Sequence, residues 1–190
     1  MPTPERTTTD EVVAAARGLV EGGGPDALTM QAVAAQVGVR APSLYKRVRS
    51  REHLLGLVVE RETRELARVL DDAAHSEPAD PARRLVALAT ALRAHAHAHP
   101  RLFGLLVSPL PTAAAPPRDA LEAASDAVLR TCAELVGPEH ALDAARTVTA
   151  WAYGFLTMEL SGAFQLGGDP GDAFDFGAQA VARSIATLAG

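Results

Sequence analysis

The chain has 190 residues, a formal net charge of −5 and a single cysteine. This length suits one large domain or a small domain followed by a larger one, and a hydrophobic content of 48% argues against disorder. The lone cysteine excludes an intramolecular disulfide and fits a reducing compartment. The sequence shows neither a secretory signal nor the roughly 20 apolar residues of a membrane helix, so we expect a soluble cytoplasmic protein.

Positive charge is concentrated in one short window. Residues 40–51 contain no acid and five cations, Arg40, Lys46, Arg47, Arg49 and Arg51. The window therefore carries +5, and because the whole chain carries −5, the other 178 residues carry −10. Such segregation indicates one surface built for an anion.

Short helices in close succession are predicted around this window. Thr8 and Glu11 form a capping box for a helix over 9–21, which a Gly-Gly-Gly-Pro run ends. A second helix over 30–37 follows Thr29 as N-cap and stops at Gly38. Pro42 suits the start of a third helix over 42–48, and a longer helix runs from about residue 50 to 74.

The two short helices and the turn at Gly38 predict a helix-turn-helix. A helix fits the major groove of DNA, whose walls are phosphates. Side chains placed to face bases are Arg40, Ala41, Ser43, Lys46 and Arg47, and those better placed for phosphate are Tyr45, Arg49 and Arg51. Thr29, at a helix N-terminus, combines a hydroxyl with free backbone N–H groups and predicts a further anion contact.

Two simpler interpretations of this segment remain open. A cluster of charges on a short helix is also typical of a solvated surface, and Tyr45 is also compatible with a half-buried core position. Further helices are predicted over 81–99, 101–108, 118–136, 139–164 and 172–188, with a Pro/Ala-rich loop at 108–117. No strand is predicted, so the fold class is all-α.

The segments ALTMQAVA (27–34) and GVRAPSLYKRVRSREHLL (38–55) resemble the DNA-binding domain of the TetR family of bacterial transcription regulators. The resemblance implies a helix-turn-helix in an N-terminal three-helix bundle (1–55) and a C-terminal helical bundle for effector binding and dimerisation (56–190). It also implies a homodimer on a palindromic operator of double-stranded DNA. Thr29, Tyr45 and Arg51 would then hold phosphates, and Pro42 would lie against the groove floor. Arg51 replaces the usual lysine and Lys46-Arg47 also depart from the family pattern, so positive charge is retained while base preference differs.

The segments AHAHPRLF (96–103) and WAYGFLTMEL (151–160) are similar to the TetR C-terminal domain class named for a W-H-G motif, with Tyr153 in place of the histidine. Large side chains gather here, and they predict the wall of an effector pocket made by Phe103, Leu106, Val107, Trp151, Tyr153, Phe155 and Met158. Glu159 lies in the same apolar segment and is a candidate to orient a ligand. A plain core or a dimer interface is the alternative for the aromatic residues, and an exposed or paired role is the alternative for Glu159. Gly154 and Gly162 suit close helix approach at a dimer interface made by the last two helices.

Enzymatic activity is not expected, because no nucleophile, phosphate-binding or metalloprotease motif is present. His95, His97 and His99 alternate by two, so only the first and last share a helix face, and we expect no metal or cofactor. The predicted function is a ligand-responsive transcription regulator, a repressor released from its operator by a small molecule. The alternative is a helical ligand-binding or oligomeric protein without sequence-specific DNA binding.

Overall fold

The structure is a computed structural model that describes residues 7–77 and 79–188. Over this part the chain forms α-helices and short 3₁₀ turns and contains no strand, which confirms the all-α prediction. It divides into two compact units. One reaches to Thr63 and includes 99–117, and the other comprises the described residues from 64 to 98 and from 118 to 188. These units differ from the expected ranges 1–55 and 56–190, because the long helix α4 (Arg51–Ser76) contributes to both and 99–117 belongs with the N-terminal residues.

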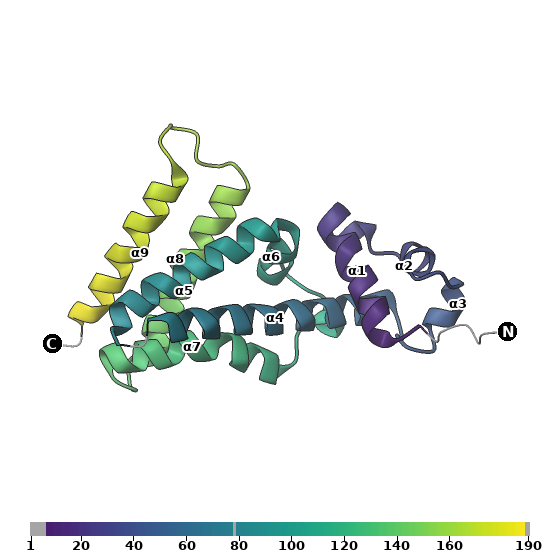
Figure 1. The fold of residues 1–190 in the computed structure, drawn as a ribbon, viewed down its shortest axis with the longest axis horizontal. Coiled ribbons are helices and arrows are strands. Elements are labelled where there is room, and N and C mark those ends of the chain that lie inside the picture. The colour runs from purple at the N-terminus through teal and green to yellow at the C-terminus, as the bar shows by residue number, and fades with distance from the viewer. Residues whose placement is uncertain (1–6, 78, 189–190) are drawn as a thin grey trace. The chain divides into compact units, whose positions relative to one another are not determined.

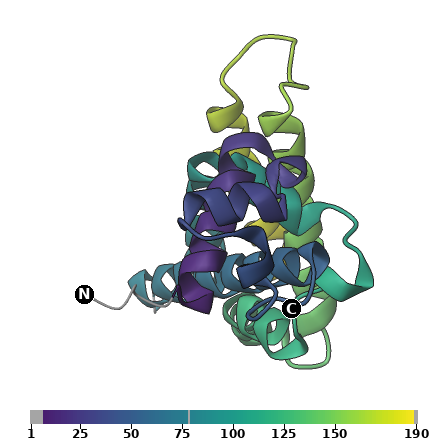
Figure 2. The same cartoon turned by 90° about the vertical axis from the view of Figure 1, so that its right-hand side faces the viewer.

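The N-terminal unit contains α1 (Thr9–Gly23), α2 (Met30–Gln36), α3 (Ala41–Leu44), the first half of α4, and α6 (Pro100–Val107) (Figures 1 and 2). Short 3₁₀ turns at Pro25–Ala27 and Thr112–Ala114 complete it. The capping box of Thr8 and Glu11 is formed, so the predicted start of α1 is confirmed. Apolar side chains of this unit pack into one buried core, which contains Val12, Leu28, Val33, Leu44, Leu54 and Val58.

Residues 99–117 belong to this unit for identifiable reasons. Leu102, Leu105 and Ala114 are buried in the same core. Arg101 donates from Nη1 to the carbonyl oxygens of residues 21 and 22 at 2.9 and 3.0 Å, which satisfies the free carbonyls at the end of α1. A Cβ on Gly56 would lie 3.1 Å from the Cα of Ala114, so a glycine at this point of α4 lets the loop approach.

The C-terminal unit contains α5 (Pro81–Ala98), α7 (Arg118–Val136), α8 (Ala141–Leu160), α9 (Pro170–Thr187) and the second half of α4. α5 packs against α7 and α9, and α7 packs against α8. α8 and α9 form a helical hairpin whose connecting loop extends beyond the ends of both helices (Figures 1 and 2). No helix in the described part of the chain is long and apolar enough to cross a membrane.

The end of α8 corrects one expectation. The predicted helix over 139–164 stops at Leu160, and Gly162 adopts φ +70°. The N–H of Gly162 donates to the carbonyl of Glu159, and that of Ala163 donates to the carbonyl of Met158, which is the hydrogen-bond pattern of a glycine helix stop. Gly162 therefore lies just beyond the end of α8, outside the helix predicted over 139–164.

Candidate nucleic-acid interface

A glycine turn separates α2 from α3. Gly38 adopts φ +72°, where a side chain would be strained. Its N–H donates to the carbonyl of Ala35 at 3.3 Å, and the N–H of Val39 donates to the carbonyl of Ala34 at 2.9 Å. This Schellman motif ends α2 and redirects the chain within two residues, so the helix-turn-helix geometry follows from the sequence.

The second helix of the motif is shorter than predicted. α3 covers Ala41–Leu44, and residues 45–47 form turns instead of continuing to Val48. The hydrogen bonds of Lys46 and Arg47 reach back three residues, whereas the N–H of Val48 regains a bond to the carbonyl of Leu44 at 3.0 Å. Leu44 and Val48 are both buried, so this tight turn still presents the intervening residues to solvent.

Every predicted DNA-contacting side chain between residues 40 and 49 is accessible. Ala41 is partly buried, and the others are exposed, namely Arg40, Pro42, Ser43, Tyr45, Lys46, Arg47 and Arg49. The side chain of Tyr45 is 56% exposed, which excludes the alternative of a core tyrosine. In the described residues, no ion pair or side-chain hydrogen bond engages the cationic groups of Arg40, Lys46, Arg47 and Arg49. These four cations thus face solvent without compensation by an acid of residues 7–77 and 79–188.

Thr29 and Arg51 are engaged with the N-terminal unit itself. The Thr29 hydroxyl accepts a hydrogen bond from the N–H of Ala32 at 3.1 Å and so caps α2, as predicted. Arg51 donates from Nε to the carbonyl of Leu28 at 2.7 Å and from Nη2 to the carbonyl of Pro25 at 2.6 Å. Its guanidinium therefore joins the start of α4 to the segment before α2, a structural role that the sequence alone did not reveal.

The residues of the predicted effector pocket fall into both units. Phe103, Leu106 and Val107 belong to the N-terminal unit, where Phe103 is buried and Leu106 packs on the core. The other five lie in the C-terminal unit, namely Trp151, Tyr153, Phe155, Met158 and Glu159. None of the eight is among the residues that line the cavities of about 240, 510 and 730 Å³ in the C-terminal unit.

Glu159 is paired. Its side chain is 7% exposed, and it accepts hydrogen bonds from Nε and Nη2 of Arg93 on α5. Nε2 of His97 lies 3.2 Å from its second oxygen. The Arg93 hydrogen bonds, aided by His97, hold the pKa of Glu159 below its ordinary value. The carboxylate is thus committed to fixing α8 on α5.

The aromatic residues form a packed cluster between α8 and α9. The ring of Trp151 packs against Phe174 with centroids 5.1 Å apart and the planes tilted by 33°, and Phe155 meets the Phe174 ring edge-on at 5.3 Å. Phe174 is fully buried, and the Arg93 guanidinium lies 5.5 Å from its ring centroid. These ring contacts pack α8 on α9. Burial raises the pKa of the Tyr153 phenol on the same helix.

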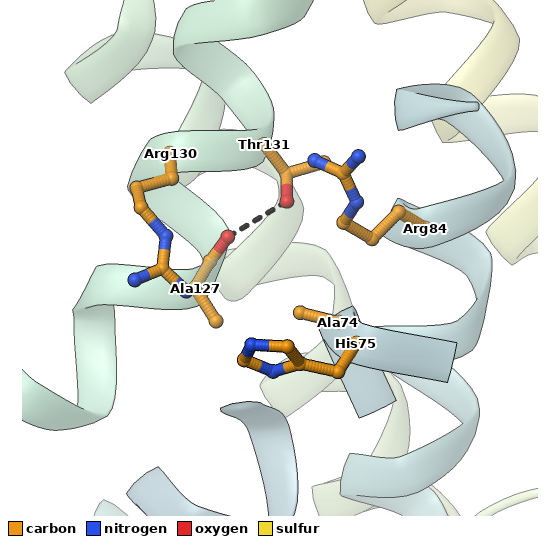
Figure 3. Close-up of a pocket in the computed structure, with 6 residues that line it drawn as sticks. All are labelled: Ala74, His75, Arg84, Ala127, Arg130 and Thr131. Atoms are coloured by element: carbon orange, nitrogen blue, oxygen red, sulfur yellow. Dashed lines mark hydrogen bonds between the residues drawn. The ribbon is translucent and has the colours of Figure 1, made fainter. Parts of the chain in front are cut away.

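The C-terminal unit contains cavities of about 240, 510 and 730 Å³. The smallest, about 240 Å³, is lined by residues of α4, α5 and α7, including His75, Arg84, Arg130 and Thr131 (Figure 3). Its cations are compensated, because Arg84 binds Glu134 at 2.9 Å and Arg130 binds both Asp71 and Asp126. The Thr131 hydroxyl donates to the carbonyl of Ala127 (Figure 3). A second cavity of about 510 Å³ adjoins Arg130 between α4 and α7, and the third, about 730 Å³, lies along α5.

The lone cysteine and the histidines of α5 are further residues with reactive or metal-binding side chains. Cys132 is buried, and desolvation raises the pKa of its thiol to about 11, so it is inert at neutral pH. Among residues 7–77 and 79–188, no group of three or more His, Cys, Asp or Glu side chains is placed to hold a metal ion. His95 is buried on α5, and His97 contacts Glu159.

Several solved structures have the same fold as this chain, and each match covers nearly all of it. A protein of unknown function from Rhodococcus sp. RHA1 is 23% identical with a TM-score of 0.81, over 97% of this chain and 100% of that one. A possible TetR family transcriptional regulator from Streptomyces coelicolor A3(2) is 21% identical with a TM-score of 0.74, over 95% and 100% of the two chains. A TetR variant from Acinetobacter baumannii AYE in complex with minocycline is 22% identical with a TM-score of 0.70, over 97% and 99%.

Family comparisons agree with this fold and with the helix-turn-helix. No curated protein sequence matches the chain. Residues 5–58 match the family described as bacterial regulatory proteins, tetR family, and residues 85–181, just over half of the chain, match the tetracyclin repressor-like C-terminal domain. The chain therefore belongs to the TetR family and is a ligand-responsive, DNA-binding transcription regulator.

Proposed function

We propose that the protein is a cytoplasmic homodimeric repressor that binds a palindromic operator and is released from it by a small-molecule effector. The observation that carries this proposal is the unpaired cationic segment of the helix-turn-helix. In a chain of net charge −5, four exposed cations without an acidic partner among the residues that the structure describes imply an external anion as their partner.

Roles for the individual side chains follow from their placement. Ser43, Lys46 and Arg47 face solvent from α3 and the turn after it, and with Arg40 and Ala41 they form the surface that reads base edges. The Tyr45 hydroxyl, the Arg49 guanidinium and the hydroxyl hydrogen of Thr29 hold phosphates, which fix the register without reading sequence. Pro42 lies on the groove floor. Arg51 supports this surface by holding α4 against residues 25–28.

A second copy of the chain fits the outer face of the α8–α9 hairpin. Large apolar side chains are exposed there, with Phe176 at 72% and Met158 at 48%. Ala150 and Gly154 lie exposed on α8, and Ala173 on α9, so two such faces can approach closely. A two-fold dimer presents two helix-turn-helix motifs to half-sites roughly one DNA turn apart, about 34 to 36 Å.

Release by an effector is a population shift. A ligand that binds the non-DNA-binding arrangement more tightly lowers operator occupancy, by an amount set by its differential affinity. α4 is the element that transmits this change, because one continuous helix runs through the cores of both units.

The test is DNA binding measured as a function of salt. After selection of an operator from random duplexes, the full chain is expected to bind with a steep log–log salt dependence, about −0.9 per phosphate contact. The variants Lys46→Gln and Arg49→Gln are expected to reduce affinity. Arg118→Gln, which removes an exposed arginine of α7, is the matched control and keeps wild-type affinity.

Sedimentation of Phe176→Arg tests the dimer, because a charge at the centre of the interface is expected to give monomers that no longer bind the operator. A flat salt response, with equal binding by all cation variants, would instead support the alternative of a helical ligand-binding protein without DNA recognition.

A further inference from the structure

The largest of the three cavities is a groove of about 730 Å³ on the C-terminal unit. One face of α5 forms its floor, where Val86, Ala87, Ala91 and Ala94 recur at helical spacing. The end of α4 and one edge of α9 form its sides. The volume lies within the range of roughly 300 to 1,000 Å³ that is typical of small-molecule sites. Small side chains along α5 thus leave room where larger ones would fill the space between helices.

Charge at the edge of the groove is positive. Arg183 on α9 lines it, is exposed, and forms no ion pair or hydrogen bond within residues 7–77 and 79–188. Arg83 on α5 also lines it, and its Nε lies 3.9 Å from Oε2 of Glu77, the acid that lines the groove. Two guanidinium groups and one carboxylate therefore line a mostly apolar groove. The amide of Gln179 adds a neutral hydrogen-bonding group beside Arg183.

This combination selects one class of ligand. An apolar floor several side chains long is complementary to an aliphatic or aromatic body, and a guanidinium without a partner is complementary to a carboxylate, which it can bind with two parallel hydrogen bonds. A cationic ligand would be repelled by two arginines, and an uncharged ligand would form no ion pair with Arg183. The ligand expected here is an amphipathic monocarboxylate.

We propose that the α5 groove binds an amphipathic carboxylate and that this molecule is the effector, an inference that rests on the proposed function. Ala73 and Ser76 of α4 and the following Glu77 line the groove, while Glu62 of the same helix is buried in the N-terminal unit. A ligand in the groove thus contacts the last turn of the helix that fixes the helix-turn-helix through its first turns. The smaller cavity in Figure 3 is a weaker candidate, since the acids Asp71, Asp126 and Glu134 already compensate its arginines.

The test uses three probes with the same ten-carbon tail, decanoate, decanol and decyltrimethylammonium, titrated calorimetrically into the full chain. Decanoate is expected to bind about three- to tenfold more tightly than decanol, and the cationic probe least tightly. Arg183→Gln is expected to reduce decanoate affinity to that of decanol while leaving decanol binding unchanged. Ala94→Trp, an exposed position that tolerates a large side chain, is expected to abolish binding of both. Arg146→Gln, an exposed arginine of α8 outside the three cavities, is the matched control.

Equal affinity for all three probes, or unchanged decanoate binding in Arg183→Gln and Ala94→Trp, would overturn the proposal. Dissociation of a dimer by Ala94→Trp in sedimentation would also overturn it, because a second copy would then occupy the groove. In an operator-binding assay, decanoate is expected to lower occupancy by the wild type but not by Arg183→Gln. Binding in the groove without an effect on occupancy would overturn the effector assignment. Failure of the wild type to bind any operator would contradict the proposed function. Calorimetry would in that case still show whether decanoate binds in the groove.

Discussion

Arg17 on α1 donates from Nε to Oε1 of Glu62 on α4 at 2.5 Å, and the Glu62 side chain is only 1% exposed. Three turns earlier in α4, Arg51 donates to the carbonyls of Pro25 and Leu28. The first half of α4 is therefore joined at both ends to the segments that carry the helix-turn-helix. A displacement of this half of α4 has to carry the DNA-binding surface with it, since separating them would leave a buried carboxylate unpaired.

Arg17→Met is expected to destabilise the protein, because it leaves the buried Glu62 carboxylate without its cation. Removing one partner of a fully buried pair costs about 3 to 5 kcal/mol, and the partial exposure of Arg17 reduces our expectation to about 1 to 3 kcal/mol. Urea denaturation measures the difference. Arg17→Met/Glu62→Leu is expected to recover most of the loss. Arg68→Met, which removes an exposed partner of Glu65, is the control and is expected to cost less than about 1 kcal/mol. Equal losses for the buried and the exposed pair would contradict this assignment.

Substitutions of Arg51 and Arg49 are expected to affect different properties: that of Arg51 lowers stability, and that of Arg49 weakens DNA binding. Arg51→Met loses two hydrogen bonds from a charged group to backbone carbonyls and is expected to lower the free energy of unfolding by about 1 to 3 kcal/mol. The Arg49 side chain is exposed and has no partner in the described chain, so Arg49→Met is expected to leave stability within about 0.5 kcal/mol. Arg49→Met is expected instead to reduce the salt slope of operator binding. Full stability of Arg51→Met, together with a reduced salt slope, would assign Arg51 to phosphate alone.

Local sequence signals predicted the N-terminal helices well because each signal acts through neighbouring backbone groups. The capping box at Thr8, the Thr29 cap and the glycine stop at Gly38 need no distant residue, and all three are formed. The burial of Leu44 followed from helical spacing, whereas the same spacing did not decide the exposure of Tyr45.

Features that depend on distant segments could not be predicted in this way. The Arg51 contact spans 23 and 26 residues, and the Arg101 contact with the end of α1 spans about 80. No periodicity shows that Leu102 and Leu105 join the N-terminal core. The cavities of about 240, 510 and 730 Å³ lie where small side chains or paired charges leave space, and no hydrophobic pattern pointed to them. A cavity forms where side chains are too small to fill the space between helices, and a hydrophobic pattern does not show where this happens.

Tyr45 and Ser43 are expected to affect DNA binding in different ways. Tyr45→Phe removes a hydroxyl assigned to phosphate, so affinity is expected to fall by a similar factor for every duplex tested. Ser43→Ala and Arg47→Ala each remove a group assigned to bases, and each is expected to change the preference among operator variants by about 1 to 3 kcal/mol. Binding to a panel of single-base operator variants measures both effects. A uniform loss of affinity for all three substitutions would show that the surface reads no bases.

Gly177→Ala is expected to disturb the aromatic cluster. A Cβ at this position of α9 would lie 2.5 Å from Cζ2 of Trp151, so the ring has to move away from Phe174. Such overpacking costs about 1 to 3 kcal/mol. The chain has one tryptophan, so its fluorescence spectrum reports the displacement directly. Gly104→Ala on α6, where nothing lies within 4 Å of the added Cβ, is expected to leave the spectrum unchanged and to stabilise the helix by up to about 1 kcal/mol. An unchanged spectrum in Gly177→Ala would contradict the close packing of Trp151 on α9.

Glu159 is expected to make the stability of the C-terminal unit depend on acid pH. The Arg93 hydrogen bonds, with His97 and a smaller cost from burial, set its pKa in the folded state below its value in the unfolded chain, which is about 4.3. Asp169 and Asp175 also face Arg93, and their charges help to keep the guanidinium protonated. Because the folded-state pKa is lowered, the stabilisation is complete above the unfolded-state pKa and is lost as the pH falls through the folded-state pKa.

Urea denaturation of the wild type and Glu159→Gln at pH 7, 5, 4 and 3 checks this expectation. The wild type is expected to be more stable by about 1 to 3 kcal/mol at pH 7 and 5, because the glutamine loses hydrogen bonds to charged partners. This difference is expected to shrink between pH 4 and 3, since protonation of Glu159 removes the same interaction from the wild type. Glu122→Gln, which removes an exposed carboxylate paired with Arg118, is the matched control and is expected to show a difference of less than about 1 kcal/mol throughout. A difference between wild type and Glu159→Gln that stays constant from pH 7 to 3 would show that the carboxylate contributes by packing and not by its charge.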